Sequence, residues 1–174
     1  MHRSAAILTV ILALLAGLPN GAAAQRRKPG IQPDGPAGQA SVTIEAKVGG
    51  KKYKASGSGE CKHAPDASIR GVSAALWMVH YTSAKDGSLK QLNLTLWRPK
   101  DESPDQLSLS LETGSGSHRI ETGGTGENSG EGSVTILPSG PGGRLEISGK
   151  EAGGKPIQIT IDCPAFAGIE AEGG

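Results

Sequence analysis

The chain has 174 residues, and its 18 Lys and Arg against 17 Asp and Glu give a formal net charge of +1. This near-neutral balance gives no overall charge that would attract the chain to nucleic acid, so we expect no nucleic-acid partner. Only 3% of the residues are aromatic while glycine occurs 27 times, so a core would have to be built from Leu, Ile and Val.

Residues 1–24 have the pattern of a secretory signal peptide. Arg3 precedes the apolar run of residues 5–17, and three alanines at 22–24 offer a cleavage site. The run is shorter than the roughly 20 apolar residues that span a bilayer, so we expect no integral membrane segment after cleavage. Leu18 stands where a bacterial lipoprotein would carry its acylated cysteine. The sequence therefore predicts a secreted or periplasmic bacterial protein.

A linker and one short hairpin follow the signal. Residues 25–40 are rich in Pro and Gly and lack apolar periodicity, which is typical of a disordered linker. From residue 41 apolar and polar residues alternate, which predicts a strand at 41–48, a Gly49-Gly50 turn and a second strand at 51–60. Gly57 and Gly59 suggest a bulge or a close backbone approach, and we expect residues 62–71 to form a connection.

The rest of the chain repeats the same pattern of short alternating segments and turns. Strands are expected at 75–83, 89–98, 107–111, 118–121, 134–136, 145–147 and 157–163. No segment has a convincing helical period. About eight short strands separated by turn residues predict an all-β protein, an antiparallel β-sandwich or small open barrel, over residues 41–164. We expect residues 165–174 to be a flexible tail.

The two cysteines of the chain lie near the two ends of this predicted body. In an exported chain, Cys61 and Cys163 most simply form a disulfide. In the chain-entropy model such a long loop closure stabilises a fold by about 4–5 kcal/mol. A zinc site is disfavoured because only His63 lies nearby and a closed site needs about four ligands.

Two segments of the sequence resemble the mycobacterial small lipoprotein antigens. They are the Gly-Ser stretch at 57–61, which leads to Cys61, and the alternating strands at 145–150 and 156–163, which end on Cys163. This resemblance implies a β-sandwich with an envelope or surface role and without known catalytic residues. The acylated cysteine of that family is absent, so lipid tethering is not implied here.

Trp77 and Trp97 are the candidate binding residues. Tryptophans on the face of a sheet can bind carbohydrate or apolar ligands, although scarce aromatic residues more often fill the core. We therefore leave open whether they lie in the core or at the surface. The leading hypothesis is a non-enzymatic binding or structural protein, whose partner would be an envelope polysaccharide, a lipid or another protein.

Catalytic and metal-binding patterns are sparse, and we expect no cofactor. The alternative function is a small secreted hydrolase that uses His80 or His118, but no nucleophile motif accompanies either histidine. The glycine-rich loop from Glu127 to Glu131 has side-chain oxygens that could bind calcium, although an ordinary hairpin loop is favoured. No metal site is predicted.

Overall fold

The computed structural model describes residues 40–69, 71–83, 88–123 and 129–169, and these residues form a single sheet of ten strands. The strands are β1 (Ala40–Val48), β2 (Lys51–Ile69), β3 (Val72–Thr82), β4 (Leu89–Pro99), β5 (Gln106–Thr113), β6 (Gly116–Glu121), β7 (Glu131–Ser139), β8 (Gly142–Lys150), β9 (Pro156–Cys163) and β10 (Ala167–Gly168). The predicted linker at 25–40 lies almost entirely outside these ranges. No helix long and apolar enough to cross a membrane occurs in the part of the chain that is described.

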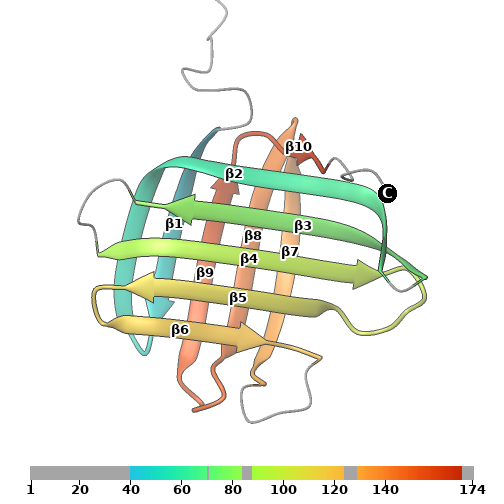
Figure 1. Cartoon of the computed structure of the whole chain (residues 1–174). Coiled ribbons are helices and arrows are strands. Elements are labelled where there is room, and N and C mark those ends of the chain that lie inside the picture. The colour runs from blue at the N-terminus through green and yellow to red at the C-terminus, as the bar shows by residue number, and fades with distance from the viewer. Residues whose placement is uncertain (1–39, 70, 84–87, 124–128, 170–174) are drawn as a thin grey trace, which may run out of the picture. The chain divides into compact units, whose positions relative to one another are not determined.

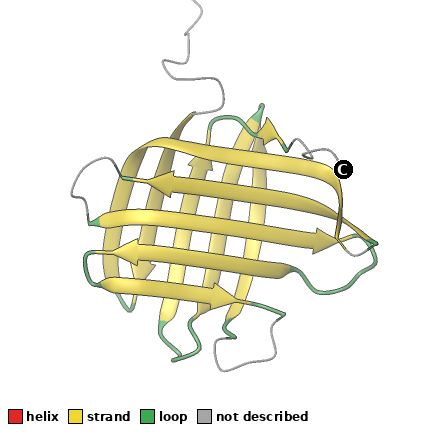
Figure 2. Cartoon of the chain, viewed as in Figure 1, coloured by secondary structure: helices red, strands yellow, loops and turns green. Residues whose placement is uncertain are grey.

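The sheet folds over itself into an open half-barrel. Its strand order is β6-β5-β4-β3-β2-β1-β9-β8-β7, with every pair on this path antiparallel, and β10 pairs with β2 in parallel. Figure 1 shows β2–β6 crossing in front of β1, β9, β8 and β7, and Figure 2 shows that strands make up nearly all of the body. The predicted all-β antiparallel class is confirmed.

Strand β2 belongs to both layers because it bends at its glycines. A Cβ at Gly59 would lie 2.8 Å from Val42 Cγ2 and 2.9 Å from the His80 carbonyl oxygen, so only glycine fits between β1 and β3. The predicted close backbone approach is confirmed. The connection expected at 62–71 is wrong, because β2 pairs with β3 as far as Ile69 across a register shift between Ala64 and Ala67. Such a shift accommodates Pro65, which has no N–H to donate to a ladder.

The core lies between the two layers and follows the predicted alternation. The residues with no exposed surface are almost all Leu, Ile and Val, which include Val42, Ile44, Leu92, Leu96, Leu109, Leu111, Ile120, Leu145, Ile157 and Ile161. Burying each such side chain contributes about 1.5–3 kcal/mol. Tyr53 and Tyr81 are the aromatic residues that are buried within this core.

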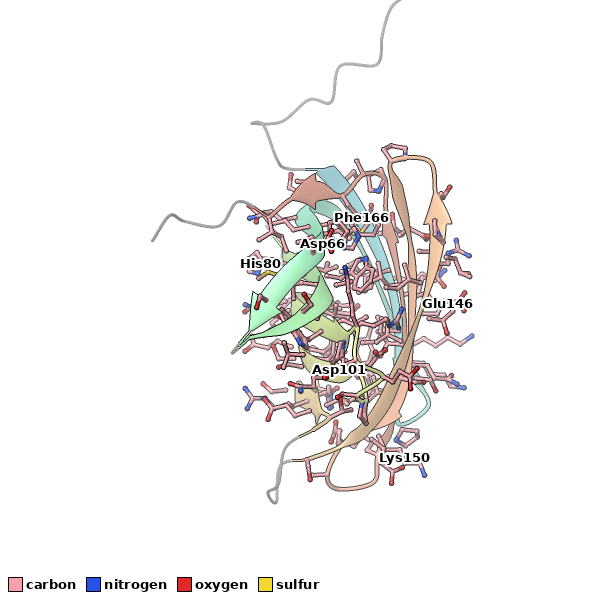
Figure 3. All side chains as sticks on the ribbon, turned by 90° about the vertical axis from the view of Figure 1, so that its right-hand side faces the viewer. Asp66, His80, Asp101, Glu146, Lys150 and Phe166 are labelled. Carbon is pink, nitrogen blue, oxygen red and sulfur yellow. A yellow bond between two sulfur atoms is a disulfide. The ribbon has the colours of Figure 1, made fainter. Side chains whose placement is uncertain are left out.

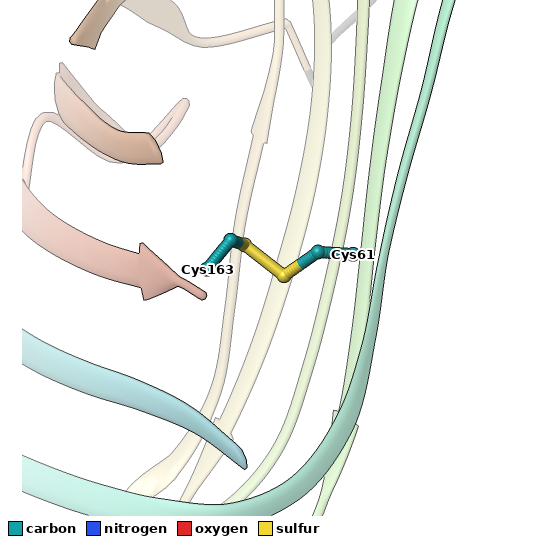
Figure 4. Close-up of a disulfide and its surroundings, with 2 residues drawn as sticks. All are labelled: Cys61 and Cys163. Atoms are coloured by element: carbon teal, nitrogen blue, oxygen red, sulfur yellow. A yellow bond between two sulfur atoms is a disulfide. The ribbon is translucent and has the colours of Figure 1, made fainter. Parts of the chain in front are cut away.

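A disulfide joins the layers near one end. Cys61 of β2 and Cys163 at the end of β9 are bonded, with their Cα atoms 6.0 Å apart (Figure 4). The predicted pairing is confirmed. Residues 165–169 do not form the expected free tail, because Phe166 packs against the core, its N–H donates to Pro141 O (2.9 Å), and β10 pairs with β2. Residues 170–174 lie outside the described ranges.

The two edge strands of the half-barrel approach each other without forming a ladder. One backbone hydrogen bond, from Gly130 N to Glu121 O at 2.9 Å, links the segments next to them. A Cβ at Gly132 would lie 3.0 Å from Ile120 Cγ2, and one at Gly149 would lie 2.9 Å from Ile120 Cδ1. The absence of side chains at these glycines lets Ile120 of β6 pack against the backbones of β7 and β8.

Candidate binding surface

The outer face of β3 and β4 carries apolar residues where alternation would place polar ones. On β3, Val72 and Met78 point outward and are 37% and 39% exposed. On β4, Leu92, Leu94 and Leu96 belong to the core, so Trp97 points to the opposite side. Trp97 is only 6% exposed and does not belong to the main core, so it is buried on the outer side of β4. We call the outward apolar group the Trp97 surface; its exposed or half-buried members are Val72, Leu76 and Met78, and its buried members are Ala74, Trp97 and Pro99.

A groove of about 560 Å³ runs beside Trp97. Its lining includes Val72 and Pro99, the outward residues of β5 and β6, and the start of the loop after β4. A second hollow of about 250 Å³ lies along the same face, next to Met78 and His80. Both hollows are lined by Thr95, so they are neighbours on one continuous face.

The loop between β4 and β5 forms one rim of the groove. The backbone N–H of Ser103 donates to Asp101 Oδ1 at 3.2 Å, and hydrogen bonding from Ser103 lowers the pKa of the Asp101 carboxyl below its ordinary value. Glu102 has a φ of 66°, the only positive value for a non-glycine residue in the described ranges. Lys100 N donates to Ser73 O at 2.9 Å, which fixes the start of the loop against β3. The rim therefore presents ionised acidic groups.

A row of polar side chains crosses the same face next to the apolar group. His80 Nδ1 is 2.6 Å from Asn93 Oδ1, and Asn93 Nδ2 donates to Ser110 Oγ at 3.4 Å. Thr82 Oγ1 lies 3.4 Å from His80 Nε2. These contacts engage both ring nitrogens of His80, and within the described residues no carboxylate is among its hydrogen-bond partners. Figure 3 shows His80 on the opposite outer side of the molecule from Glu146 of β8. The described residues thus give His80 amide and hydroxyl partners rather than the carboxylate that commonly orients a catalytic histidine.

The two tryptophans lie on opposite faces of the sheet. Trp77 pairs with Leu96 and points inward, where it packs against the core. The His63 ring is stacked on it with centroids 4.3 Å apart, and the Arg98 guanidinium carbon lies 5.5 Å from its centroid. A single binding platform made of Trp77 and Trp97 is therefore not formed. Of the two predicted binding residues, only Trp97 lines the groove.

His118 belongs to a polar network at another place, between the β5–β6 turn and the β8–β9 turn. Its Nδ1 lies 2.5 Å from Glu151 Oε1, and its Nε2 lies 3.5 Å from Thr113 Oγ1. Thr113 donates to Gly116 O at 3.0 Å, and its oxygen is also 3.0 Å from Ser115 Oγ. Ser115 in turn contacts the hydroxyl of Tyr53. These contacts satisfy every buried polar side-chain atom in the described network.

This network has the partners of a catalytic triad but not its geometry. The hydroxyl facing His118 is that of Thr113, which is 4% exposed and already donates its proton to a carbonyl oxygen. The exposed Ser115 has its closest contacts with Thr113 and Tyr53. A nucleophile must be reachable by substrate and within reach of its base. The arrangement instead holds the β5–β6 turn and the β8–β9 turn together.

Metal binding has little support in the described residues. No group of three or more His, Cys, Asp or Glu side chains that could hold a metal occurs among them. The proposed calcium loop can be followed only in part, because Glu127 and Asn128 lie outside the described ranges. Glu131 begins β7 and is exposed.

Most of the Trp97 surface was not predicted from the sequence. Leu76 and Met78 alternate with Trp77 along β3, but the pairing with β4 is what brings Leu76 opposite Trp97. The signal was present: residues 74–79 are apolar on both faces, although one face of the strand is not in the core.

Comparison with known proteins gave no relative of this chain. No protein-family model, curated protein or solved structure matches this chain. The resemblance to the mycobacterial small lipoprotein antigens stays a prediction from the segments that carry it. Function therefore has to be argued from the surface itself.

Proposed function

We propose that this chain is an exported bacterial protein, secreted or periplasmic, that acts in or near the cell envelope by binding rather than by catalysis. The signal-like residues 1–24 and the disulfide support an oxidising compartment. The Trp97 surface and its groove are the binding site in this proposal. The partner class is a polysaccharide, a lipid or a protein of the envelope.

The apolar character of the Trp97 surface is the observation that carries the proposal. The outer face of the other layer is more polar, although Leu137 of β7 is exposed there beside a hollow of about 430 Å³. There Thr43, Glu45, Thr160 and Glu146 alternate with the buried residues, and Arg144 pairs with Asp162 at 2.7 Å. Apolar groups gathered beside a groove on an outer face mark an interaction site more often than a packing accident.

The proposal can be tested with two matched surface substitutions. Met78→Ser removes an exposed apolar group from the Trp97 surface, and Leu137→Ser removes one from β7, where Leu137 is 46% exposed. Neither side chain belongs to the main core, so both variants should fold. Oxidised wild-type protein and both variants would be screened by thermal shift against neutral oligosaccharides, anionic lipid vesicles and a basic peptide.

We expect one of these classes to stabilise the wild type and Leu137→Ser but not Met78→Ser. A ligand at about 100 times its dissociation constant stabilises by about 2.7 kcal/mol, which raises the melting temperature by several degrees. Equal stabilisation of both variants would place the binding site elsewhere. No stabilisation by any class would count against the proposed function.

A further inference from the structure

We propose that the groove beside Trp97 binds an extended peptide segment of a partner protein that presents a lysine or arginine side chain among apolar residues. This inference rests on the proposed function, because it names the ligand class of the same surface. It is argued from the charge of the groove, its apolar floor and its continuity along the sheet.

The charged groups that line the groove are all acidic. Asp101 comes from the loop after β4 and Glu121 from the end of β6, and no Lys, Arg or His is among the described lining residues. Glu102 adds a further exposed carboxylate next to Asp101. An anionic ligand, such as a phospholipid headgroup or an acidic polysaccharide, would be repelled here, whereas a cation would be attracted.

Several basic side chains of the same layer are engaged by carboxylates that do not line the groove. Lys62 pairs with Glu60 at 2.9 Å, Lys100 pairs with Asp66, and Arg98 makes a forked contact with Asp105 on the inner side. Among the described residues, Arg119 is the cation that pairs with a lining carboxylate, Glu121.

The two lining carboxylates are correspondingly available to a ligand. Arg119 approaches Glu121 only to 3.7 Å, and both side chains are substantially exposed. Asp101 makes no ion pair within the described residues, and the hydrogen bonds from Ser103 that lower its pKa keep it ionised. The groove thus holds Asp101, which has no ion-pair partner among the described residues, and Glu121, whose pairing with Arg119 is long and exposed.

The floor of the groove suits the stem of a basic side chain. Val72, Trp97, Pro99 and Leu107 provide the apolar part of the lining. Lysine and arginine bury their methylene stems on such surfaces while their charged ends reach polar groups. A neutral sugar would use the apolar floor but would leave Asp101 without a counter-charge.

The remaining lining residues suit an extended backbone. Thr95, Ser103, Gln106 and Ser108 supply hydroxyl and amide groups that can donate to or accept from peptide groups. Thr95 also lines the neighbouring hollow beside Met78, so a ligand of several residues can continue along the face. The exposed Met78 side chain would contact an apolar residue next to the basic one.

The test uses a fluorescein-labelled synthetic peptide, Gly-Leu-Lys-Pro-Leu-Lys-Gly, with fluorescence polarisation as the readout. A charge-reversed peptide with Glu in place of both lysines and a neutral N-acetylglucosamine tetramer are the comparison ligands. The proteins are the oxidised wild type, the double variant Asp101→Asn with Glu121→Gln, and Glu112→Gln. Glu112 is an exposed carboxylate of β5 that does not line the groove, so it is the matched control.

We expect the lysine peptide to bind the wild type and Glu112→Gln equally, and the double variant about fivefold more weakly. Binding should weaken between about 20 mM and about 300 mM salt, because exposed charges are screened. The charge-reversed peptide should not bind. The inference fails if both peptides bind alike, if the double variant binds as tightly as the wild type, or if only the N-acetylglucosamine tetramer binds.

The two proposals fail in different ways. If a neutral oligosaccharide or lipid vesicle stabilises the protein and Met78→Ser abolishes that effect, the surface is a binding site but the basic peptide is the wrong ligand. If no ligand of any class depends on Met78, the proposed function fails together with this inference.

Discussion

The two ends of the layer formed by β1, β9, β8 and β7 are fastened to the opposite layer by different chemistry. At one end, the covalent bond between Cys61 and Cys163 joins β9 to β2. At the other end, hydrogen bonds do the same work: His118 of β6 contacts Glu151 beyond β8, and Tyr53 of β2 contacts Ser115 in the β5–β6 turn.

This difference implies that the two ends respond to different conditions. The disulfide is lost only when it is reduced, whereas the hydrogen-bond network depends on the protonation and burial of its members. Both ends hold the layer of β2–β6, whose outer face carries the Trp97 surface. Both therefore help to keep the proposed binding site on a rigid support.

Removing the disulfide should have the largest effect on stability. Replacing Cys61 and Cys163 by Ser opens a bond between residues 102 positions apart, which corresponds to a loss of about 4–5 kcal/mol in the chain-entropy model. Urea denaturation would measure it, and reduction of the wild type should give the same midpoint as the double variant. A wild type whose midpoint does not respond to reductant would show that the bond is absent or contributes nothing.

The next effect concerns the tight passage of the chain beside the disulfide. A Cβ at Gly142 would collide with the Cys163 carbonyl oxygen, so Gly142→Ala must displace the segment after β9. We expect a loss of about 2–3 kcal/mol, as for overpacked sites. Gly153→Ala in the β8–β9 turn is the control, because a Cβ there would meet nothing within 4 Å and no positive φ is involved. Equal denaturation midpoints for the two variants would contradict the crowding at this end.

Disrupting the hydrogen-bonded end should lower the stability by a smaller but still measurable amount. His118→Leu removes the partner that Glu151 contacts at 2.5 Å, and we expect a loss of about 1–3 kcal/mol because that carboxylate is largely buried. Glu151→Gln keeps a hydrogen-bond acceptor and should therefore lose less stability than His118→Leu. A double-mutant cycle with both changes measures the coupling directly. Additive losses would mean that the two side chains do not stabilise each other.

The fold class followed from the sequence because it depends on a local property, the alternation of apolar and polar residues. Val42, Ile44, Leu92 and Leu94 alternate with polar neighbours, and all of them lie in the core. Gly59 likewise indicated a close approach of two backbones. The disulfide was predictable because an exported chain with only two cysteines leaves few alternatives.

The features that sequence reasoning missed depend on neighbours distant in the chain. The length of β2 beyond Cys61 depends on its pairing with β3, which tolerates Pro65 through a register shift. The position of Phe166 depends on the start of β8, because its ring lies beside Gly143. The Trp97 surface requires the register of β3 with β4, which places Leu76 opposite Trp97. The alternation of residues within one strand cannot predict these contacts, because they depend on how different strands pair.

The smallest expected effect is the titration of Tyr53 at the hydrogen-bonded end. The hydrogen bond with Ser115 lowers the pKa of the Tyr53 phenol below its ordinary value near 10, with smaller contributions from Thr113 and Lys51. Because the folded pKa is the lower one, the unfolded chain holds more protons between the two values. The stabilising contribution of Tyr53 therefore grows as the pH rises through this window, and it is lost as the pH falls through the folded value.

Absorbance at about 295 nm, taken as the difference between wild type and Tyr53→Phe, isolates this phenol from the other tyrosine. We expect the midpoint of the difference curve to lie below the ordinary value, and Ser115→Ala to return it toward that value. A midpoint that stays low in Ser115→Ala would assign the effect to Thr113 and Lys51; the Lys51 Nζ lies 5.5 Å from the ring centroid. The hydrogen bond between Tyr53 and Ser115 would then lower the Tyr53 pKa less than its other neighbours do. The two ends of the layer would still differ, because one is held by a covalent bond and the other by polar contacts.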